Sequence, residues 1–112
     1  MKINDLETHE QHALGGLIRM MIRSDGDFTE QEEAKVNAIG EQLGGAGLIW
    51  RTISASAQAC PEDEQIREVA ARVVRPEARE LILDAVEQVA GSDGVADAER
   101  ELLGWVRQSW TG

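Results

Sequence analysis

The tripeptide Ser-Asp-Gly occurs twice in the chain, at residues 24–26 and again at residues 92–94. Each copy follows a segment with an apolar helical pattern and precedes an acidic one. Glycine readily adopts the left-handed conformation that ends a helix, and Ser and Asp favour turns, so each copy predicts a corner between two helices. The corners are 68 residues apart, from Asp25 to Asp93. We therefore expect a fold built from two helix-turn-helix repeats.

The same register extends backwards from the two corners. Apolar residues recur at the i, i+3, i+4, i+7 spacing that places them on one face of a helix. The matching pairs are Leu14 with Ile82, Leu17 with Ala85, Ile18 with Val86, and Met21 with Val89. After the glycines the copies differ, because Glu32 follows Gly26 by six residues and Glu99 follows Gly94 by only five. The second turn is thus one residue shorter than the first.

Six segments carry helical signals, and none is a convincing strand. The expected helices span residues 8–23, 29–43, 46–59, 61–73, 76–90 and 97–109. Capping-box pairs and prolines mark several helix starts. These signals are Thr8 with Gln11, Thr29 with Glu32, Pro61, and Pro76. The pattern predicts an all-α, compact single-domain bundle over residues 1–112, with repeat 1 at 8–43, middle helices at 46–73 and repeat 2 at 76–110.

Two pairs of adjacent glycines have different expected roles. Gly15 and Gly16 lie inside the first helix, where each glycine costs about 1 kcal/mol relative to alanine. We expect them to be retained because another helix packs closely against that point. Gly44 and Gly45 follow the second helical pattern and are expected to end it.

Composition excludes several functional classes. The chain has 112 residues, 42% of them hydrophobic and 29% charged, and a net charge of −10. An acidic surface disfavours binding to nucleic acid or anionic membranes and favours cations and basic partners. No apolar run approaches the ~20 residues of a membrane span, and the N-terminus lacks a secretory signal, so we expect a cytoplasmic protein without direct membrane insertion. Cys60 is the only cysteine, which rules out an internal disulfide.

A resemblance follows from the second corner. The segment from Arg79 to Gly94, followed by Glu99 and Leu102-Leu103, is similar to the second half of the TerB-like family, the helical tellurite-resistance proteins. That family also resembles the N-terminal part of DjlA-type co-chaperones, and the resemblance covers roughly residues 10–110. It implies a helical bundle, an association with stress response and membrane-linked complexes, and, for some members, a divalent cation near the paired Asp-Gly turns. Matching acidic positions are Asp25, Glu32, Asp93 and Glu99.

The residues around the corners suit a hard cation. Side-chain oxygens are dense around the first corner, as Ca²⁺ and Mg²⁺ require. The candidate ligands are Asp25, Asp27, Glu32, Asp93, Asp97 and Glu99, for Ca²⁺, Mg²⁺, Mn²⁺ or Zn²⁺. The first corner is not an EF-hand, because Glu30 and Val36 occupy the positions of its glycine and its last glutamate when counted from Asp25. In the alternative interpretation, the aspartates only accept backbone hydrogen bonds in their turns.

Catalytic patterns are weak, so we expect a non-enzymatic protein. His9 and His12 are three residues apart, one fewer than in the zincin pattern, and neither has a glutamate three residues before it. We expect both to be surface residues. Cys60 has no cysteine partner, and no phosphate-binding glycine loop is present.

The tryptophans suggest a second function. Trp50 and Trp105 are expected in the core, whereas Trp110 lies two residues from the end of the sequence, where an exposed indole could anchor a partner protein. The sequence therefore supports two functional hypotheses. One is a TerB-like module that binds a divalent cation, and the other is a metal-free protein interaction or co-chaperone-like scaffold domain. Partner and oligomeric state stay open.

Overall fold

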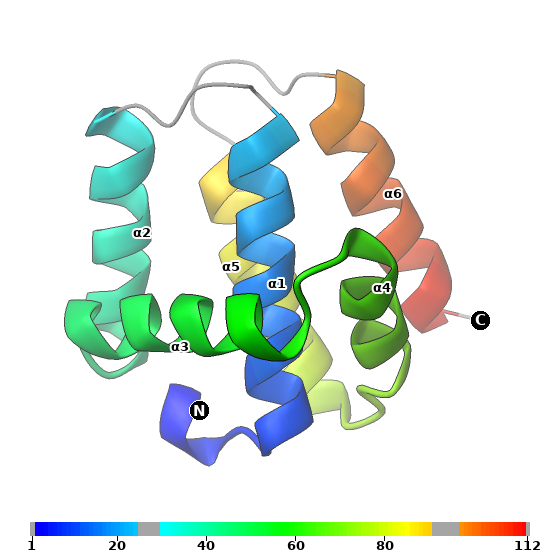
Figure 1. Cartoon of the computed structure of the whole chain (residues 1–112), viewed down its shortest axis with the longest axis horizontal. Coiled ribbons are helices and arrows are strands. Elements are labelled where there is room, and N and C mark those ends of the chain that lie inside the picture. The colour runs from blue at the N-terminus through cyan, green and yellow to red at the C-terminus, as the bar shows by residue number, and fades with distance from the viewer. Residues whose placement is uncertain (1, 25–29, 91–96, 112) are drawn as a thin grey trace.

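The computed structural model describes residues 2–24, 30–90 and 97–111, with side chains described for 2–22, 30–89, 101 and 104–110. Within these residues the protein is a bundle of six α-helices preceded by one turn of 3₁₀-helix, which confirms the expected all-α class. The elements are η1 (Ile3–Asp5), α1 (Thr8–Ser24), α2 (Glu30–Leu43), α3 (Ala46–Ala59), α4 (Asp63–Ala71), α5 (Pro76–Ala90) and α6 (Asp97–Thr111). Figure 1 shows them gathered in one globule of 31 × 29 × 24 Å.

Helix α1 is the centre of the bundle. It packs against α3, α4 and α5, and to a lesser extent against α6. As Figure 1 shows, α3 lies across α1, and α2 and α6 lie on either side of α1. Helix α2 packs mainly on α3 and more sparsely on α5. None of the helices, over the residues that the structure describes, is long and apolar enough to cross a membrane.

The two apolar stripes that the 68-residue register pairs are both part of the core. All eight side chains are buried: Leu14, Leu17, Ile18 and Met21 of α1, and Ile82, Ala85, Val86 and Val89 of α5. Helices α1 and α5 also contact each other directly. The spacing therefore identified the buried faces correctly. That the two halves are copies of one structural unit stays a prediction.

The paired glycines of α1 lie where other helices come closest. A Cβ atom added at Gly15 would lie 2.7 Å from the carbonyl oxygen of Thr52 and 3.0 Å from Cβ of Ser56, both in α3. One added at Gly16 would lie 2.8 Å from the side chain of Ile66 in α4. The Ser56 hydroxyl donates a hydrogen bond of 2.9 Å to the carbonyl oxygen of His12, which ties the two backbones together. The expectation of close packing is confirmed.

The other pair of glycines forms the sharp connection from α2 to α3. Gly44 and Gly45 have φ values of 130° and 136°, which residues with a side chain rarely adopt. The Gly45 N–H donates to the Gly40 carbonyl oxygen at 2.6 Å and closes the turn. The expected end of the second helix at this point is confirmed.

The expected start of the fourth helix is wrong. Pro61 is not in a first turn: α4 begins at Asp63, and the N–H of its N-cap residue, Glu62, donates to Oε1 of Gln65 at 3.0 Å. Since the side chain of Gln65 satisfies this cap, the helix starts two residues later than the proline suggested. Val73 is buried, but it lies beyond the end of α4. Pro76, in contrast, is the first residue of α5 as expected.

The expected pairing of Thr8 with Gln11 is also wrong. Thr8 is already the first residue of α1. The Gln11 amide instead donates to the carbonyl oxygens of Ile3, at 3.1 Å, and Leu6, at 3.2 Å. These bonds hold the preceding 3₁₀ turn against α1 and bury the Ile3 side chain completely.

We predict that Gly15→Ala destabilises the protein by about 1 to 3 kcal/mol, because the methyl group collides with backbone atoms of α3 that cannot move aside easily. This loss exceeds the gain of about 1 kcal/mol that alanine brings to a helix interior. Urea unfolding followed by circular dichroism measures the change.

Gly104→Ala is the matched control, because a Cβ at this position in α6 meets no atom within 4 Å. We expect it to stabilise the protein slightly. Equal effects of the two substitutions would contradict the proposed close approach of α1 and α3.

Candidate functional site

Four helix ends gather at one end of the molecule. These are the C-terminal ends of α1 and α5 and the N-terminal ends of α2 and α6, seen together at the top of Figure 1. The sequence predicts cation ligands at this end. Asp25, Asp27 and Asp93 lie outside the described residues, and Asp97 and Glu99 lie in the first turn of α6 with side chains that are also outside them. The fold thus brings together the helices that carry both corners.

Glu32 is the one predicted ligand whose side chain the structure describes. It lies in the first turn of α2 and is only 9% exposed, whereas its neighbours Glu30 and Glu33 are exposed. It shares the buried face of α2 with Val36 and Ile39, at the i, i+4, i+7 spacing. A carboxylate is therefore buried at the end of the molecule where the C-terminal ends of α1 and α5 and the N-terminal ends of α2 and α6 lie.

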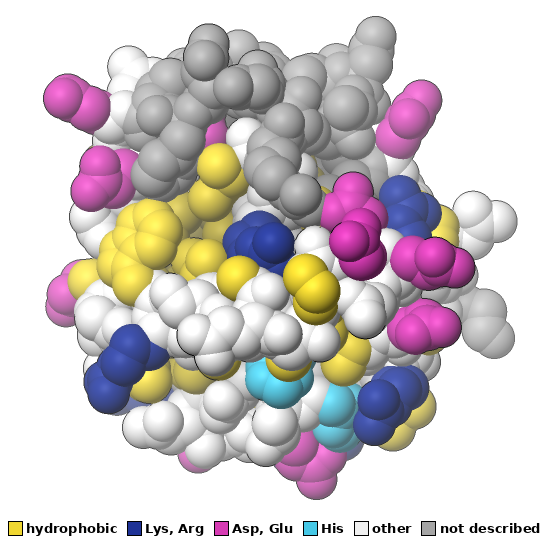
Figure 2. Space-filling model, in the orientation of Figure 1, with side chains coloured by type: hydrophobic (Ala, Val, Ile, Leu, Met, Phe, Trp, Pro, Cys, Tyr) yellow, Lys and Arg dark blue, Asp and Glu magenta, His cyan; other side chains and the backbone are white. Residues whose placement is uncertain are grey.

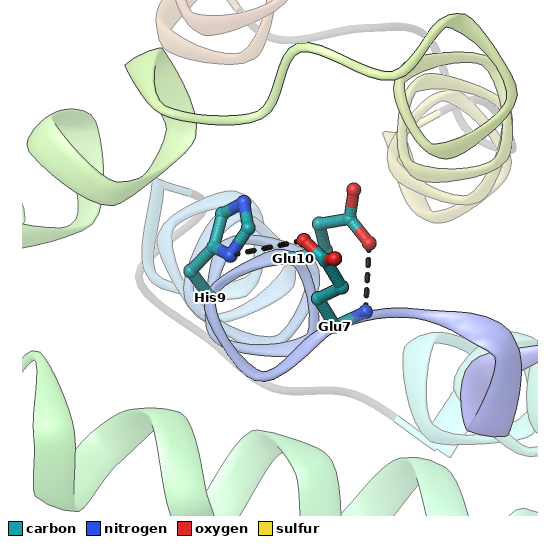
Figure 3. A group of neighbouring side chains, drawn as sticks. All are labelled: Glu7, His9 and Glu10. Atoms are coloured by element: carbon teal, nitrogen blue, oxygen red, sulfur yellow. Dashed lines mark hydrogen bonds and ion pairs between the residues drawn. The ribbon is translucent and has the colours of Figure 1, made fainter.

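A second group of ionisable side chains lies at the start of α1, where the sequence pattern predicts no metal site. Single ligand atoms of Glu7, His9 and Glu10 all lie within 4.8 Å of one another (Figure 3). Glu7 is exposed, His9 is half-buried and Glu10 is buried. Nδ1 of His9 lies 3.7 Å from a carboxylate oxygen of Glu7. The types and distances of these side chains are compatible with a metal ion.

The hydrogen bonds of Glu10 indicate a structural role instead. Nε of Arg75 donates to one carboxylate oxygen of Glu10 at 2.8 Å, and a terminal nitrogen of Arg75 donates to the other. That second oxygen also accepts the backbone N–H of Glu7 at 2.7 Å. The same terminal nitrogen of Arg75 donates to the carbonyl oxygen of Asp5 at 3.1 Å. A cation would have to displace the guanidinium from both oxygens, so we interpret the group as a clamp between α1 and the start of α5.

The pKa values of the clamp agree with this interpretation. The hydrogen bond from Arg75 lowers the pKa of Glu10, with a further contribution from the N–H of Glu7, and together they outweigh the effect of burial, which raises it. The Glu10 carboxylate in turn raises the pKa of Arg75. Both partners therefore stay ionised at neutral pH.

Figure 2 shows the two histidine side chains in cyan. Both histidines line a cavity. The cavity has a volume of about 470 Å³ and lies between α1, the end of α3 and α4. Both histidines are half-buried, more than the surface position expected for them, and Cys60, which also lines the cavity, is buried. Among the described residues, neither His12 nor Cys60 belongs to a group of three metal-ligating side chains.

All three tryptophans are half-buried and held by specific contacts. Nε1 of Trp50 donates to Oδ1 of Asn37 at 2.6 Å. Nε1 of Trp110 donates to the Ala70 carbonyl oxygen at 2.9 Å. The Arg67 guanidinium lies 4.9 Å from the ring centroid of Trp105, a cation–π contact. The hypothesis that Trp110 is exposed is wrong, because α6 continues to Thr111 and carries this indole onto α4.

A groove between α2 and α5 has a volume of about 700 Å³. Its apolar lining consists of Ile39, Leu43, Leu81, Leu83 and Ala85, and its polar lining of Gln42, Glu77, Glu80, Asp84, Glu87 and Gln88. The four carboxylates recur along α5 at three- and four-residue intervals, which places them along one side of that helix. This spacing is visible in the sequence, but only the position of α2 shows that it borders a groove.

Comparisons with known proteins add no relative: no family model matches the chain, and neither a curated protein nor a solved structure is similar to it.

We predict that Glu10→Gln lowers the free energy of unfolding by about 1 to 2 kcal/mol at neutral pH, a range reduced because the Arg75 side chain is 37% exposed. A lowered pKa in the folded state stabilises the protein above the ordinary pKa of glutamate, about 4.3, and this stabilisation is lost as the pH falls through the lowered value. The difference between wild type and variant should therefore shrink as the pH decreases. Urea unfolding between pH 7 and pH 3 tests this.

Glu64→Gln, on the exposed side of α4, is the matched control and should leave the stability nearly unchanged at every pH. A stability difference for Glu10→Gln that stays constant with pH would show that the charge of the clamp contributes nothing.

Proposed function

We propose that the protein is a non-enzymatic helical module that holds a divalent cation with carboxylates from its two Asp-Gly corners. The observation that carries this proposal is the convergence of the four helix ends that flank the corners (Figure 1). The inward position of Glu32 at the start of α2 adds a buried carboxylate at the same end. A resident cation would compensate the mutual repulsion of carboxylates gathered there.

The ligands in this proposal are oxygens. They come from Asp25, Asp27, Glu32, Asp93, Asp97 and Glu99. Carboxylate oxygens suit Ca²⁺, Mg²⁺ and Mn²⁺ better than Zn²⁺, which favours histidine and cysteine. Because the ligands are carboxylates, a bound cation offsets the repulsion between their negative charges. The cation therefore stabilises the folded bundle.

The biological setting in this proposal is a stress response of the tellurite-resistance type. It rests on the TerB-like resemblance of the segment before Gly94, and the all-helical bundle agrees with the fold that this resemblance implies. In that setting the cation couples the state of the acidic end to a protein partner. The chain acts as a binding module, not as a catalyst.

Thermal unfolding of chelator-treated protein, with and without Ca²⁺, Mg²⁺, Mn²⁺ or Zn²⁺, tests the cation site. A ligand that binds only the folded state stabilises it by about 2.7 kcal/mol at a hundredfold excess over its dissociation constant. We expect a rise in Tm with one of the oxygen-preferring metals and its loss in the Asp25→Ala, Asp93→Ala variant.

The control is Glu64→Ala, Glu68→Ala, which removes the same number of charges from the exposed surface of α4 and should keep the metal response. If wild type and both variants respond equally, the effect is general charge screening and the corner site is wrong. If no metal changes the Tm of the wild type, the protein has no cation site.

The second candidate function is a metal-free interaction module, and the groove between α2 and α5 is the observation that favours it. Half-buried leucines line this groove, so part of their apolar surface is left to a partner. A groove flanked by two helices is a common binding site for an amphipathic helix.

A further inference from the structure

We propose that the groove between α2 and α5 binds an amphipathic helix with a basic polar face, supplied by a partner protein. This inference rests on the second candidate function, and it adds the chemistry of the partner. It does not require the cation site.

The apolar part of the groove sets the type of contact. Leu43 of α2 and Leu81 and Leu83 of α5 are half-buried, and Ile39 and Ala85 are buried next to them. Because α2 packs mainly on α3 and touches α5 only sparsely, these leucines are not covered from both sides. Apolar side chains that line a groove in this way can contact the apolar face of an amphipathic helix, whose residues recur at i, i+3, i+4 and i+7.

The length of the groove fits a short helix. Its lining on α5 extends from Glu77 to Gln88, a distance of about 16 Å at the rise of an α-helix. Three turns of a partner helix cover the same distance.

The negative charge of the groove determines that its partner carries positive charge. Its described lining contains four carboxylates, on Glu77, Glu80, Asp84 and Glu87, and no lysine or arginine. Glu87 is paired with Arg107 of α6. Glu80 and Asp84 form no ion pair with any described lysine or arginine, so they are available to a basic partner. The net charge of −10 also attracts such a partner over longer distances.

The same charges disfavour other occupants. A second copy of the chain would bring two acidic groove borders together, and like charges in an interface oppose binding. Nucleic acids and anionic membranes are repelled for the same reason. A basic amphipathic helix satisfies both the leucines and the carboxylates.

Three labelled peptides of about 15 residues test the proposal. They share one leucine face at helical spacing and carry Lys, Gln or Glu at all other positions. Binding is followed by fluorescence anisotropy in the presence of chelator, so that the result does not depend on a cation site. Chemical shifts of the ¹⁵N-labelled protein locate the bound peptide.

We expect the Lys peptide to bind about tenfold more tightly than the Gln peptide, and the Glu peptide to bind most weakly. The largest shifts should fall on residues that line the groove, such as Leu43, Leu81 and Leu83. In the Glu80→Lys, Asp84→Lys variant, affinity for the Lys peptide should fall about tenfold. Both positions are exposed, and circular dichroism verifies that the variant is folded.

Glu64→Lys, Glu68→Lys is the matched control, because it changes the net charge equally on α4, outside the groove. Affinity for the Lys peptide should fall less than about threefold in this variant. Equal losses in the two variants would mean that binding is general charge attraction and would overturn the proposal.

Other outcomes separate the two levels of inference. If the Gln or Glu peptide binds in the groove as tightly as the Lys peptide, the basic partner is wrong but the interaction module stands. If no peptide changes the chemical shifts of the residues that line the groove, the basic partner and the interaction module are both wrong. If sedimentation shows a dimer that the Glu80→Lys, Asp84→Lys variant disrupts, a second copy occupies the groove and the proposed partner is wrong.

Discussion

The close contact of α3 and α4 with α1 at Gly15 and Gly16 is the interaction on which the other helix positions depend. Helix α1 is central, and a side chain at Gly15 would meet the backbone of α3 at Thr52. Each glycine weakens the isolated helix by about 1 kcal/mol, so the adjacent pair is favourable only because the backbone of α3 and the Ile66 side chain of α4 come so close to α1 here. Once α3 lies across α1 at this depth, it also holds α2, which packs mainly on α3.

The clamp between Glu10 and Arg75 fixes the start of the same central helix. Arg75 directly precedes Pro76, the first residue of α5, so its two hydrogen bonds to Glu10 hold the start of α5 beside the start of α1. The stripes of α1 and α5 are both buried, and the two helices pack against each other. As a result, the C-terminal ends of α1 and α5 lie at the same end of the molecule, at the top of Figure 1.

Helix α5 connects the two proposed binding regions. One side of it borders the acidic groove, and its C-terminal end leads to the second Asp-Gly corner. Both regions are negatively charged, in agreement with the net charge of −10, but they select different ligands. In our proposal the corners supply oxygen ligands for a small cation, whereas the groove, which combines carboxylates with leucine side chains, is proposed to bind a larger basic partner.

The sequence by itself determined the helices and the faces they bury, because periodicity, glycines and proline act over a few residues. Helix α3 and helix α5 have the expected bounds, and the stripes that Leu14 and Ile82 begin are in the core. The sequence could not show that Glu32, one of the predicted cation ligands, is buried, because its burial depends on what packs against α2. The tertiary structure alone decided the pairing of Glu10 with Arg75, 65 residues apart, and the groove between α2 and α5. Such features depend on the packing of separate helices, which local sequence patterns do not encode.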